Sequence, residues 1–409
     1  MNMLNHAHQI IDAALKSAQP DSAVKKALEV MPETKGELIL VAAGKAAWQM
    51  AQAAVSVLGD KLSRGIVITK YDHSQGPLDR LEIFEAGHPV PDENTFRATE
   101  AAIRMVENLK EEDRVLFLIS GGGSALFEKP VISPEELSDI TRQLLACGAD
   151  IVEMNTIRKR LSAVKGGRFA QLCAPAQVFS VVLSDIVGDP LDMIASGPAY
   201  PDSSTCEQAV RIVEKYALSL SAEALACLAK ETPKALTNVE THITGSVRQL
   251  CASAEKTCAE LGYEPMMLTD SLTCEAREAG SFLAAIARAH TGTEKPLAFI
   301  AGGETVVHLT GKGLGGRNQE IALSAAKGLD GLENVLLFSV GSDGTDGPTD
   351  AAGGMVTGKT AQALRGKGID ISDVLLNNDA YHALKACDGL IITGPTGTYV
   401  NDLCVLLIG

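Results

Sequence analysis

Two segments of the sequence combine glycine with groups that can bind an anion, each directly after an apolar run. In LILVAAGKAAWQMA, a buried strand is followed by Gly44 and Lys45 and then by a helix start. In VLFLISGGGSALFEKP, the apolar run is followed by the five residues Ser120, Gly121, Gly122, Gly123 and Ser124. Backbone N–H groups at such a turn, the positive end of a helix and a lysine all favour a phosphate ligand. An exposed helix lysine and a flexible turn are the alternatives.

A third glycine segment matches the dinucleotide-binding pattern GxGxxG. Its glycines are Gly311, Gly313, Gly315 and Gly316 in VHLTGKGLGGRNQE, and Arg317 follows at the helix entrance. The nicotinamide fingerprint also requires an acid that ends the next strand. Here Asp330 precedes that strand, so we interpret the segment as an anion-binding loop, with Arg317 able to grip phosphate or carboxylate.

A fourth pattern imitates a P-loop. Residues 353–360, GGMVTGKT, satisfy GxxxxGK[ST]. A genuine P-loop follows directly from a buried strand, whereas this pattern follows DGTDGPTDAA. We therefore expect Lys359 to be an exposed loop or helix residue.

Two groups of aspartates follow predicted strands and could hold the Mg²⁺ that ATP chemistry requires. Asp185 and Asp189 lie in SVVLSDIVGDPLD, and Asp343 and Asp346 lie in SVGSDGTDGPTD. For any single aspartate, a turn-forming or helix-capping role is an equal alternative. The segment NTIRKRLSAVKGGR, residues 155–168, is basic in an otherwise acidic chain. It is either a solvated helix face or an electropositive wall. His88 is expected to be a packed or capping histidine, with catalysis as the alternative.

The elements that must position these residues alternate between strands and helices, which is typical of a mostly parallel α/β sheet with helices on both faces. Such sheets bind ligands at the carboxyl ends of their strands. The predicted strands are 38–42, 65–69, 115–119, 178–183, 242–244, 266–268, 297–301, 305–309, 335–340 and 389–393. The predicted helices are 45–57, 94–109, 134–147, 247–261, 275–290 and 318–329. The pattern loosens between residues 218 and 240, where we place the domain boundary.

The composition excludes several classes of protein. The 409 residues are 46% hydrophobic and 21% charged, which argues against disorder. A net charge of −15 disfavours binding to nucleic acid or to an anionic membrane. The amino-terminal residues lack the pattern of a signal peptide, and no apolar run is long enough to span a membrane. The nine cysteines are scattered and never form CxxC. This pattern favours reduced thiols over disulfides or a structural zinc site. We expect a cytoplasmic protein.

Taken together, the segments resemble the MOFRL-containing glycerate kinases. The matching stretches are AAGKAA, AGHPVPD, SGGGSALFEKP, RKRLSAVKGGR, SDIVGDPLDMIASGP, GGETVVHLTGKGLGGRNQE, GSDGTDGPTDAAGG and TGPTGTYVNDL. The resemblance implies a Rossmann-like α/β/α amino-terminal domain, residues 1–235, and a smaller α/β domain of MOFRL type, residues 236–409. It further implies an active site in the cleft between the domains, with Lys45 and Arg317 as catalytic residues.

The resulting hypothesis is transfer of the γ-phosphoryl group of ATP to the 2-hydroxyl of D-glycerate, with Mg²⁺. Residues 120–124 and 311–316 would hold phosphates and substrate, Lys45 would neutralise charge, and Arg317 would hold the substrate carboxylate or stabilise the transition state. Asp185 or Asp189 would bind Mg²⁺ or orient the attacking hydroxyl. The alternatives are an NAD(P)H-dependent hydroxypyruvate reductase and a non-catalytic nucleotide-binding regulator. The oligomeric state is open, and a homodimer is one alternative.

Overall fold

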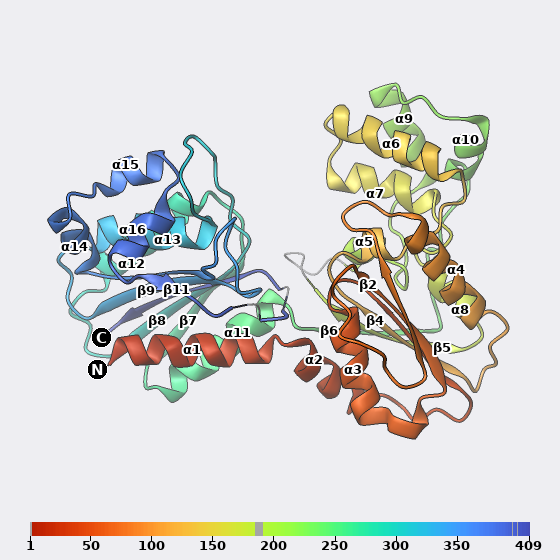
Figure 1. The fold of residues 1–409 in the computed structure, drawn as a ribbon, viewed down its shortest axis with the longest axis horizontal. Coiled ribbons are helices and arrows are strands. Elements are labelled where there is room, and N and C mark those ends of the chain that lie inside the picture. The colour runs from red at the N-terminus through yellow and green to blue at the C-terminus, as the bar shows by residue number, and fades with distance from the viewer. Residues whose placement is uncertain (1, 185–190, 395, 399) are drawn as a thin grey trace. The chain divides into compact units, whose positions relative to one another are not determined.

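The computed structural model describes residues 2–184, 191–394, 396–398 and 400–409. The chain divides into two compact units (Figure 1). The first unit contains residues 24–183 and 191–244, and the second contains residues 2–23, 184 and the described residues from 245 to 409. The units do not correspond to one cut of the chain at residue 235, because residues 236–244 belong to the first unit and residues 2–23 to the second.

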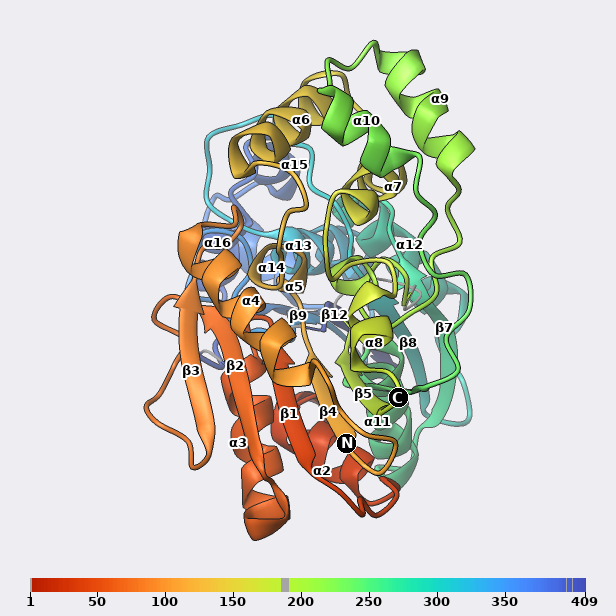
Figure 2. The same ribbon diagram turned by 90° about the vertical axis from the view of Figure 1, so that its right-hand side faces the viewer.

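The first unit is built on a parallel sheet. Its strands are β1 (Leu38–Ala43), β2 (Arg64–Lys70), β3 (Leu81–Ala86), β4 (Arg114–Ile119), β5 (Gln177–Leu183) and β6 (Val239–Thr244). They form a 6-stranded sheet in the order β3-β2-β1-β4-β5-β6 (Figure 2). All neighbouring pairs run parallel. This is the strand order of the Rossmann fold, in which the direction of winding reverses between β1 and β4.

Some helices of the first unit cover the faces of this sheet, and others form a separate group beyond the ends of its strands. They are α2 (Pro20–Leu28), α3 (Ala47–Leu58), α4 (Glu93–Val106), α5 (Gly123–Leu126), α6 (Pro134–Ala146), α7 (Ile151–Arg160), α8 (Arg168–Cys173), α9 (Cys206–Tyr216) and α10 (Ala222–Leu228), with short 3-10 helices at Gly59–Lys61 and Ile194–Ser196. Helix α3 packs on β1 and β2 from one side, and α4 packs with α8 on the other (Figure 2). Helices α6, α7, α9 and α10 share a separate apolar core. This group lies beyond the carboxyl ends of the strands (Figure 1).

The second unit contains a mixed sheet. Its strands are β7 (Glu264–Leu272), β8 (Leu297–Gly303), β9 (Val335–Gly341), β10 (Gly353–Thr357), β11 (Leu390–Ile391) and β12 (Asp402–Ile408). The order is β11-β10-β9-β12-β8-β7. Strands β7 and β8 are parallel, whereas the other neighbours are antiparallel. The expectation of a mostly parallel sheet is therefore correct for the first unit and wrong for the second.

Two layers of helices enclose the second sheet. The helices are α1 (Met3–Ser17), α11 (Val247–Glu260), α12 (Ala276–Ala289), α13 (Arg317–Leu329), α14 (Thr360–Gly366), α15 (Ile371–Leu376) and α16 (Ala380–Ala386). Helices α1 and α11 cover one face, and α12, α13 and α16 cover the other (Figure 1). Among the described residues, no helix is both long and apolar enough to cross a bilayer.

Several predicted elements differ from the structure. The predicted strand at residues 305–309 does not form, since Val306 makes only an isolated bridge to Glu275 and Leu309 is 82% exposed. The GxGxxG segment therefore does not follow a strand directly. The residues Gly353 and Gly354 of the P-loop-like pattern lie inside β10. Lys359 is exposed at the start of α14, as expected.

Candidate active site at the carboxyl edge of the first sheet

The two glycine segments of the first unit meet at the point where the sheet reverses its winding. Ala43 at the end of β1 lies beside Ile119 at the end of β4. Both strands are buried along their paired lengths, except at the half-buried first residue of β4, Arg114. Because parallel strands end at the same edge, the segments that begin at Gly44 and Ser120 leave the sheet side by side. Rossmann-like sheets bind ligands at this position.

Hydrogen bonds lock the two segments together. The backbone N–H of Lys45 donates to the carbonyl of Gly121 at 2.9 Å. The N–H of Ala46 donates to Ser120 Oγ at 3.1 Å. Gly44 is required at the crossing, because a Cβ atom there would lie 2.2 Å from Ser120 Oγ, and its φ is +128°. We call residues 44–46 and 120–124 the phosphate loops.

Lys45 and His88 both lie against the second of the three glycines. Gly122 has a φ of +83°, and a Cβ atom there would lie 3.1 Å from His88 Nε2 and 3.1 Å from Lys45 Cγ. A glycine is thus needed for both backbone conformation and close approach. Burial and the nearby charge of Lys45 lower the pKa of His88 below its usual value, which favours a neutral imidazole.

A group of polar side chains that the sequence reasoning did not single out lies against the end of the loop 120–124. Ser124 Oγ lies 3.1 Å from Ser196 Oγ, and Ser196 Oγ donates to Asn155 Oδ1 at 2.9 Å. Ala195 and Ser196 have φ values of +51° and +62°. Non-glycine residues in this left-handed region carry strain, which clusters at functional sites. The only sequence signal was SGP in the segment that resembles the family.

The basic segment is neither a solvated face nor an open electropositive wall. Lys165 is buried, and its Nζ donates to the carbonyls of Ser124 and Phe127 at 2.8 and 3.0 Å. Arg158 Nη2 also donates to the Ser124 carbonyl, at 3.3 Å. Buried Glu128 lies 3.4 Å from Lys165 Nζ. Burial lowers the pKa of Lys165 to about 8. Lys165 and Arg158 thus hold the end of the loop 120–124 through the carbonyl of Ser124.

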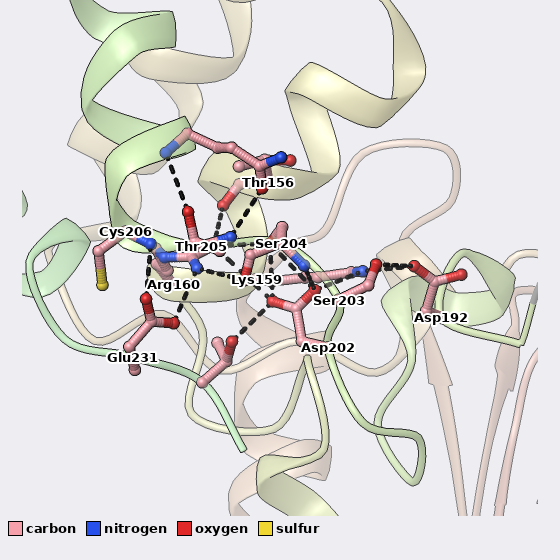
Figure 3. Close-up of polar contacts among 12 residues, drawn as sticks. Thr156, Lys159, Arg160, Asp192, Asp202, Ser203, Ser204, Thr205, Cys206 and Glu231 are labelled. Atoms are coloured by element: carbon pink, nitrogen blue, oxygen red, sulfur yellow. Dashed lines mark hydrogen bonds and ion pairs between the residues drawn. The ribbon is translucent and has the colours of Figure 1, made fainter. Parts of the chain in front are cut away.

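Two further basic residues of the segment, Lys159 and Arg160, belong to an internal ionic network (Figure 3). Lys159 Nζ lies 3.1 Å from Asp202 and 3.5 Å from Asp192. Arg160, which is fully buried, pairs with Glu231 at 3.3 Å and with Asp202 at 3.7 Å. Burial opposes ionisation of Asp202, but Lys159 and hydrogen bonds outweigh it and lower the pKa of Asp202. The network joins α7 to the segment before α9.

The second unit places Arg317 at the start of α13, where it is held by two carboxylates. Arg317 Nε and Nη2 donate to Asp402 Oδ2 and Oδ1 at 2.5 and 3.0 Å, and Nη1 donates to Glu304 Oε1 at 3.2 Å. Burial raises the pKa of Asp402 to about 6, against the effect of Arg317. Burial acts to lower the pKa of Arg317, but the bond with Asp402 outweighs it and raises this pKa. Neither Asp402 nor Glu304 was singled out from the sequence.

Most of the described N–H donors of the GxGxxG loop are used in hydrogen bonds to residues 377–379. The N–H groups of Gly311 and Leu314 donate to side-chain oxygens of Asn378 and Asp379, both at 2.9 Å. The N–H of Gly313 donates to the carbonyl of Asn377 at 2.8 Å. Among the described residues, the N–H groups of the predicted ligand residues Gly315 and Gly316 donate to no protein acceptor. Gly315 and Gly316 therefore remain the predicted anion donors in this loop.

The predicted metal ligands fall into three situations. Asp185 and Asp189 lie outside the described residues. Asp346 is buried, and its two carboxylate oxygens accept from the N–H groups of Asn318 and Gln319 at 3.1 and 2.9 Å. Asp343 is half-buried and accepts from the N–H of Thr345 at 2.9 Å. Within the described ranges, no group of three His, Cys, Asp or Glu residues is placed to hold a metal ion.

Comparison with known proteins gives a consistent assignment. Residues 6–229 match the family model described as "Domain of unknown function (DUF4147)", and residues 297–402 match the MOFRL family. A "D-glycerate 2-kinase" of Thermotoga maritima is 53% identical over 98% of this chain and 97% of its own length. A "Glycerate 2-kinase" of Pyrococcus horikoshii is 40% identical over 98% of this chain and 96% of its own. An Agrobacterium vitis relative named "Putative hydroxypyruvate reductase" is 39% identical over 98% of this chain and 93% of its own length.

Solved structures agree with this comparison. A crystal structure of a Thermotoga maritima glycerate kinase superposes with a TM-score of 0.96 at 53% identity, covering 99% of both chains. A Pyrococcus horikoshii structure gives a TM-score of 0.94 at 39% identity, covering 100% of this chain and 99% of the other. The phosphate loops at the β1 and β4 ends and the matches along nearly the whole chain lead to one conclusion. The chain belongs to the MOFRL-containing glycerate 2-kinase family.

Proposed function

We propose that this protein is a kinase that transfers the γ-phosphoryl group of ATP to the 2-hydroxyl of D-glycerate, giving 2-phospho-D-glycerate and ADP. The observation that carries the proposal is the 53% identity, over 98% of the chain, with a protein named D-glycerate 2-kinase. The crossing of the phosphate loops at the reversal point of the sheet supports it independently. Phosphoryl transfer depends mainly on positioning and charge stabilisation, which such loops provide.

The phosphate loops and Lys45 hold the nucleotide in this account. Backbone N–H groups of residues 121–124 approach the phosphate oxygens, since glycines leave no Cβ atoms in the way. Lys45 neutralises charge on the transferring group. The bond between its backbone and Gly121 fixes where the lysine side chain begins. Arg158 and Lys165, which bond to the Ser124 carbonyl, hold the loop in position.

Arg317 holds the glycerate carboxylate or stabilises the transition state. Its two bonds to Asp402 fix the plane of the guanidinium. Glu304, whose side chain is 49% exposed, occupies the remaining nitrogen Nη1. An incoming substrate carboxylate would displace Glu304 from Nη1, because both groups bind a guanidinium in the same way. We therefore assign Asp402 a positioning role and Glu304 the role of a stand-in for substrate.

Mg²⁺ would neutralise the phosphate oxygens as the bond from the γ-phosphorus to ADP breaks. Its ligands would be carboxylates together with the phosphates. Asp346 fits this role poorly because both of its oxygens already cap α13. We therefore favour Asp185 and Asp189 as ligands, with Asp343 as the further candidate. Asp185 or Asp189 would also orient the 2-hydroxyl and accept its proton as the hydroxyl oxygen bonds to phosphorus.

A reductase reading finds no support in the second unit. The GxGxxG loop lacks the strand that must precede it, and its first glycines pack against Asn377–Asp379 rather than against an open crevice. The Rossmann strand order of the first unit does not decide between the functions, since one fold hosts many activities.

The test is identification of the product by NMR after incubation with Mg·ATP and D-glycerate. The proposal requires 2-phospho-D-glycerate and ADP. We expect Lys45→Ala and Arg317→Ala each to lower kcat/KM by about 10²–10³-fold. Lys359→Ala is the matched control, since this lysine lies in a look-alike pattern and is exposed, and it should leave kcat/KM unchanged. NADH oxidation with hydroxypyruvate, without any ATP-dependent product, would contradict the proposal.

A further inference from the structure

An apolar cavity adjoins the phosphate loops in the first unit. Its volume is about 310 Å³, and it opens between the segment before α4 and helices α6 and α7. Apolar residues dominate the lining, including Val90, Phe96, Leu137 and Leu145. Volumes from about 300 Å³ upward and apolar walls with a few polar groups are typical of small-molecule sites.

Two of its lining residues connect the cavity to the phosphate loops. Arg158 lines the cavity and donates to the carbonyl of Ser124. Pro89 lines it as well and directly follows His88, whose ring lies against Gly122. Two of the residues that line the cavity, Arg158 and Pro89, therefore link it to the phosphate loops.

The polar groups of the cavity suit an uncharged, flat ligand with hydrogen-bonding edges. Ser138 and Thr141 contribute hydroxyls from α6. Arg142, the other cation in the lining beside Arg158, pairs with Asp139 at 2.8 Å. A planar guanidinium such as that of Arg158 can also stack on an aromatic ring. Among the described residues, no carboxylate lines the cavity, so a cationic ligand would lack a partner there.

We propose that this cavity binds the purine base of ATP, while the phosphate loops hold its phosphates. The inference rests on the proposed function, because it places the nucleoside of the same ATP whose phosphates Lys45 contacts. The base would lie between apolar side chains of the segment before α4 and those of α6. Its ring nitrogens and amino group would exchange hydrogen bonds with the hydroxyls of Ser138 and Thr141.

Filling the cavity tests this assignment. Ser138 is exposed on α6, so Ser138→Trp adds bulk to the cavity without disturbing the buried core. Ala146→Trp is the matched control, because Ala146 is also exposed on α6 but does not line the cavity. We measure ADP binding by isothermal titration calorimetry. We expect the dissociation constant of ADP to rise at least tenfold in Ser138→Trp and to stay unchanged in Ala146→Trp.

Turnover separates this inference from the proposed function. With Mg·ATP, Ser138→Trp should raise the KM for ATP while the KM for D-glycerate stays unchanged. Photolabelling with 8-azido-ADP should modify a peptide that contains residues 134–145. Unchanged ADP affinity in Ser138→Trp, or labelling confined to other peptides, would overturn the base assignment even if the wild type phosphorylates glycerate. If Ser138→Trp weakens ADP binding, Ala146→Trp does not, and the label lies in residues 134–145, the base assignment holds. Absence of glycerate phosphorylation would then overturn the proposed function alone.

Discussion

Replacing Gly44 by alanine tests the crossing of the phosphate loops. The added Cβ atom would lie 2.2 Å from Ser120 Oγ and 2.6 Å from the Ser120 carbonyl oxygen. The hydroxyl could rotate away, but the carbonyl belongs to the backbone and cannot. The two loops must therefore separate, which breaks the bonds from Lys45 to Gly121 and from Ala46 to Ser120.

The magnitude follows from these contacts. A non-glycine residue held at a φ of +128° costs about 1–3 kcal/mol. Each of the two broken hydrogen bonds contributes about 1 kcal/mol. We therefore expect Gly44→Ala to lower the free energy of unfolding by about 3–5 kcal/mol. Because Lys45 moves with the loop, kcat/KM should fall by about 100-fold, the effect expected for a displacement of about 1 Å.

The assay is urea unfolding followed by circular dichroism, together with steady-state kinetics of the folded variant. Gly59→Ala is the matched control. Gly59 also has a positive φ, +49°, but nothing lies within 4 Å of an added Cβ atom. This control should lose only about 1–2 kcal/mol, with unchanged kinetics. Equal losses of stability in both variants, with normal turnover in Gly44→Ala, would refute the reasoning.

Two further substitutions probe the charged groups that support the site. Asp402→Asn should lower kcat/KM, because Arg317 loses its charged partner. In the wild type, protonation of Asp402, whose pKa is about 6, should make kcat/KM fall below about pH 6, and this fall should disappear in Asp402→Asn; a pH profile identical in both proteins would count against the positioning role. Lys165→Met should destabilise the protein by about 3–5 kcal/mol because it leaves the Glu128 charge buried without its nearest cation. The double variant Lys165→Met/Glu128→Leu should regain part of that loss in urea unfolding, and a double variant no more stable than the single one would contradict this explanation.

Much of the first unit could be predicted because its strands carry continuous apolar runs. Strands β1, β4 and β5 are buried almost throughout, and their predicted bounds agree with the structure to within a residue. Strand β3 was missed because two glutamates interrupt its apolar residues in LEIFEA, at a half-exposed edge of the sheet. Strand β10 was missed because its two glycines are typical of loops, although here they allow close packing on β9 and α13.

The two errors that bear on the site have a common cause, which is contact between segments far apart in the sequence. Residues 305–309, TVVHL, are rich in β-branched and apolar side chains like a strand, but among the described residues they form only one isolated bridge, between Val306 and Glu275. Arg160 lies in a basic run that local periodicity places at the surface. Its partners Ser204 and Glu231 come from segments 44 and 71 residues away. Spacing within the run could not reveal them.

The expectation that Lys45 and Arg317 act on one ATP stays a prediction. The group around Lys45 was predictable, since a glycine and a lysine after a buried strand mark an anion site. Asp402 was not predictable in this way. It lies at the start of β12, 85 residues from Arg317, and its role depends on the register in which β12 pairs with β8 and β9.

Hydrogen exchange measured with and without ADP tests the central claim most directly, because it reports on the phosphate loops without requiring turnover. The account predicts that ADP slows exchange in peptides covering residues 44–46 and 120–124. Peptides from β10 and α14, which carry the look-alike pattern around Lys359, should exchange at the same rate in both conditions. Protection at the look-alike pattern, with no change at the phosphate loops, would contradict the account.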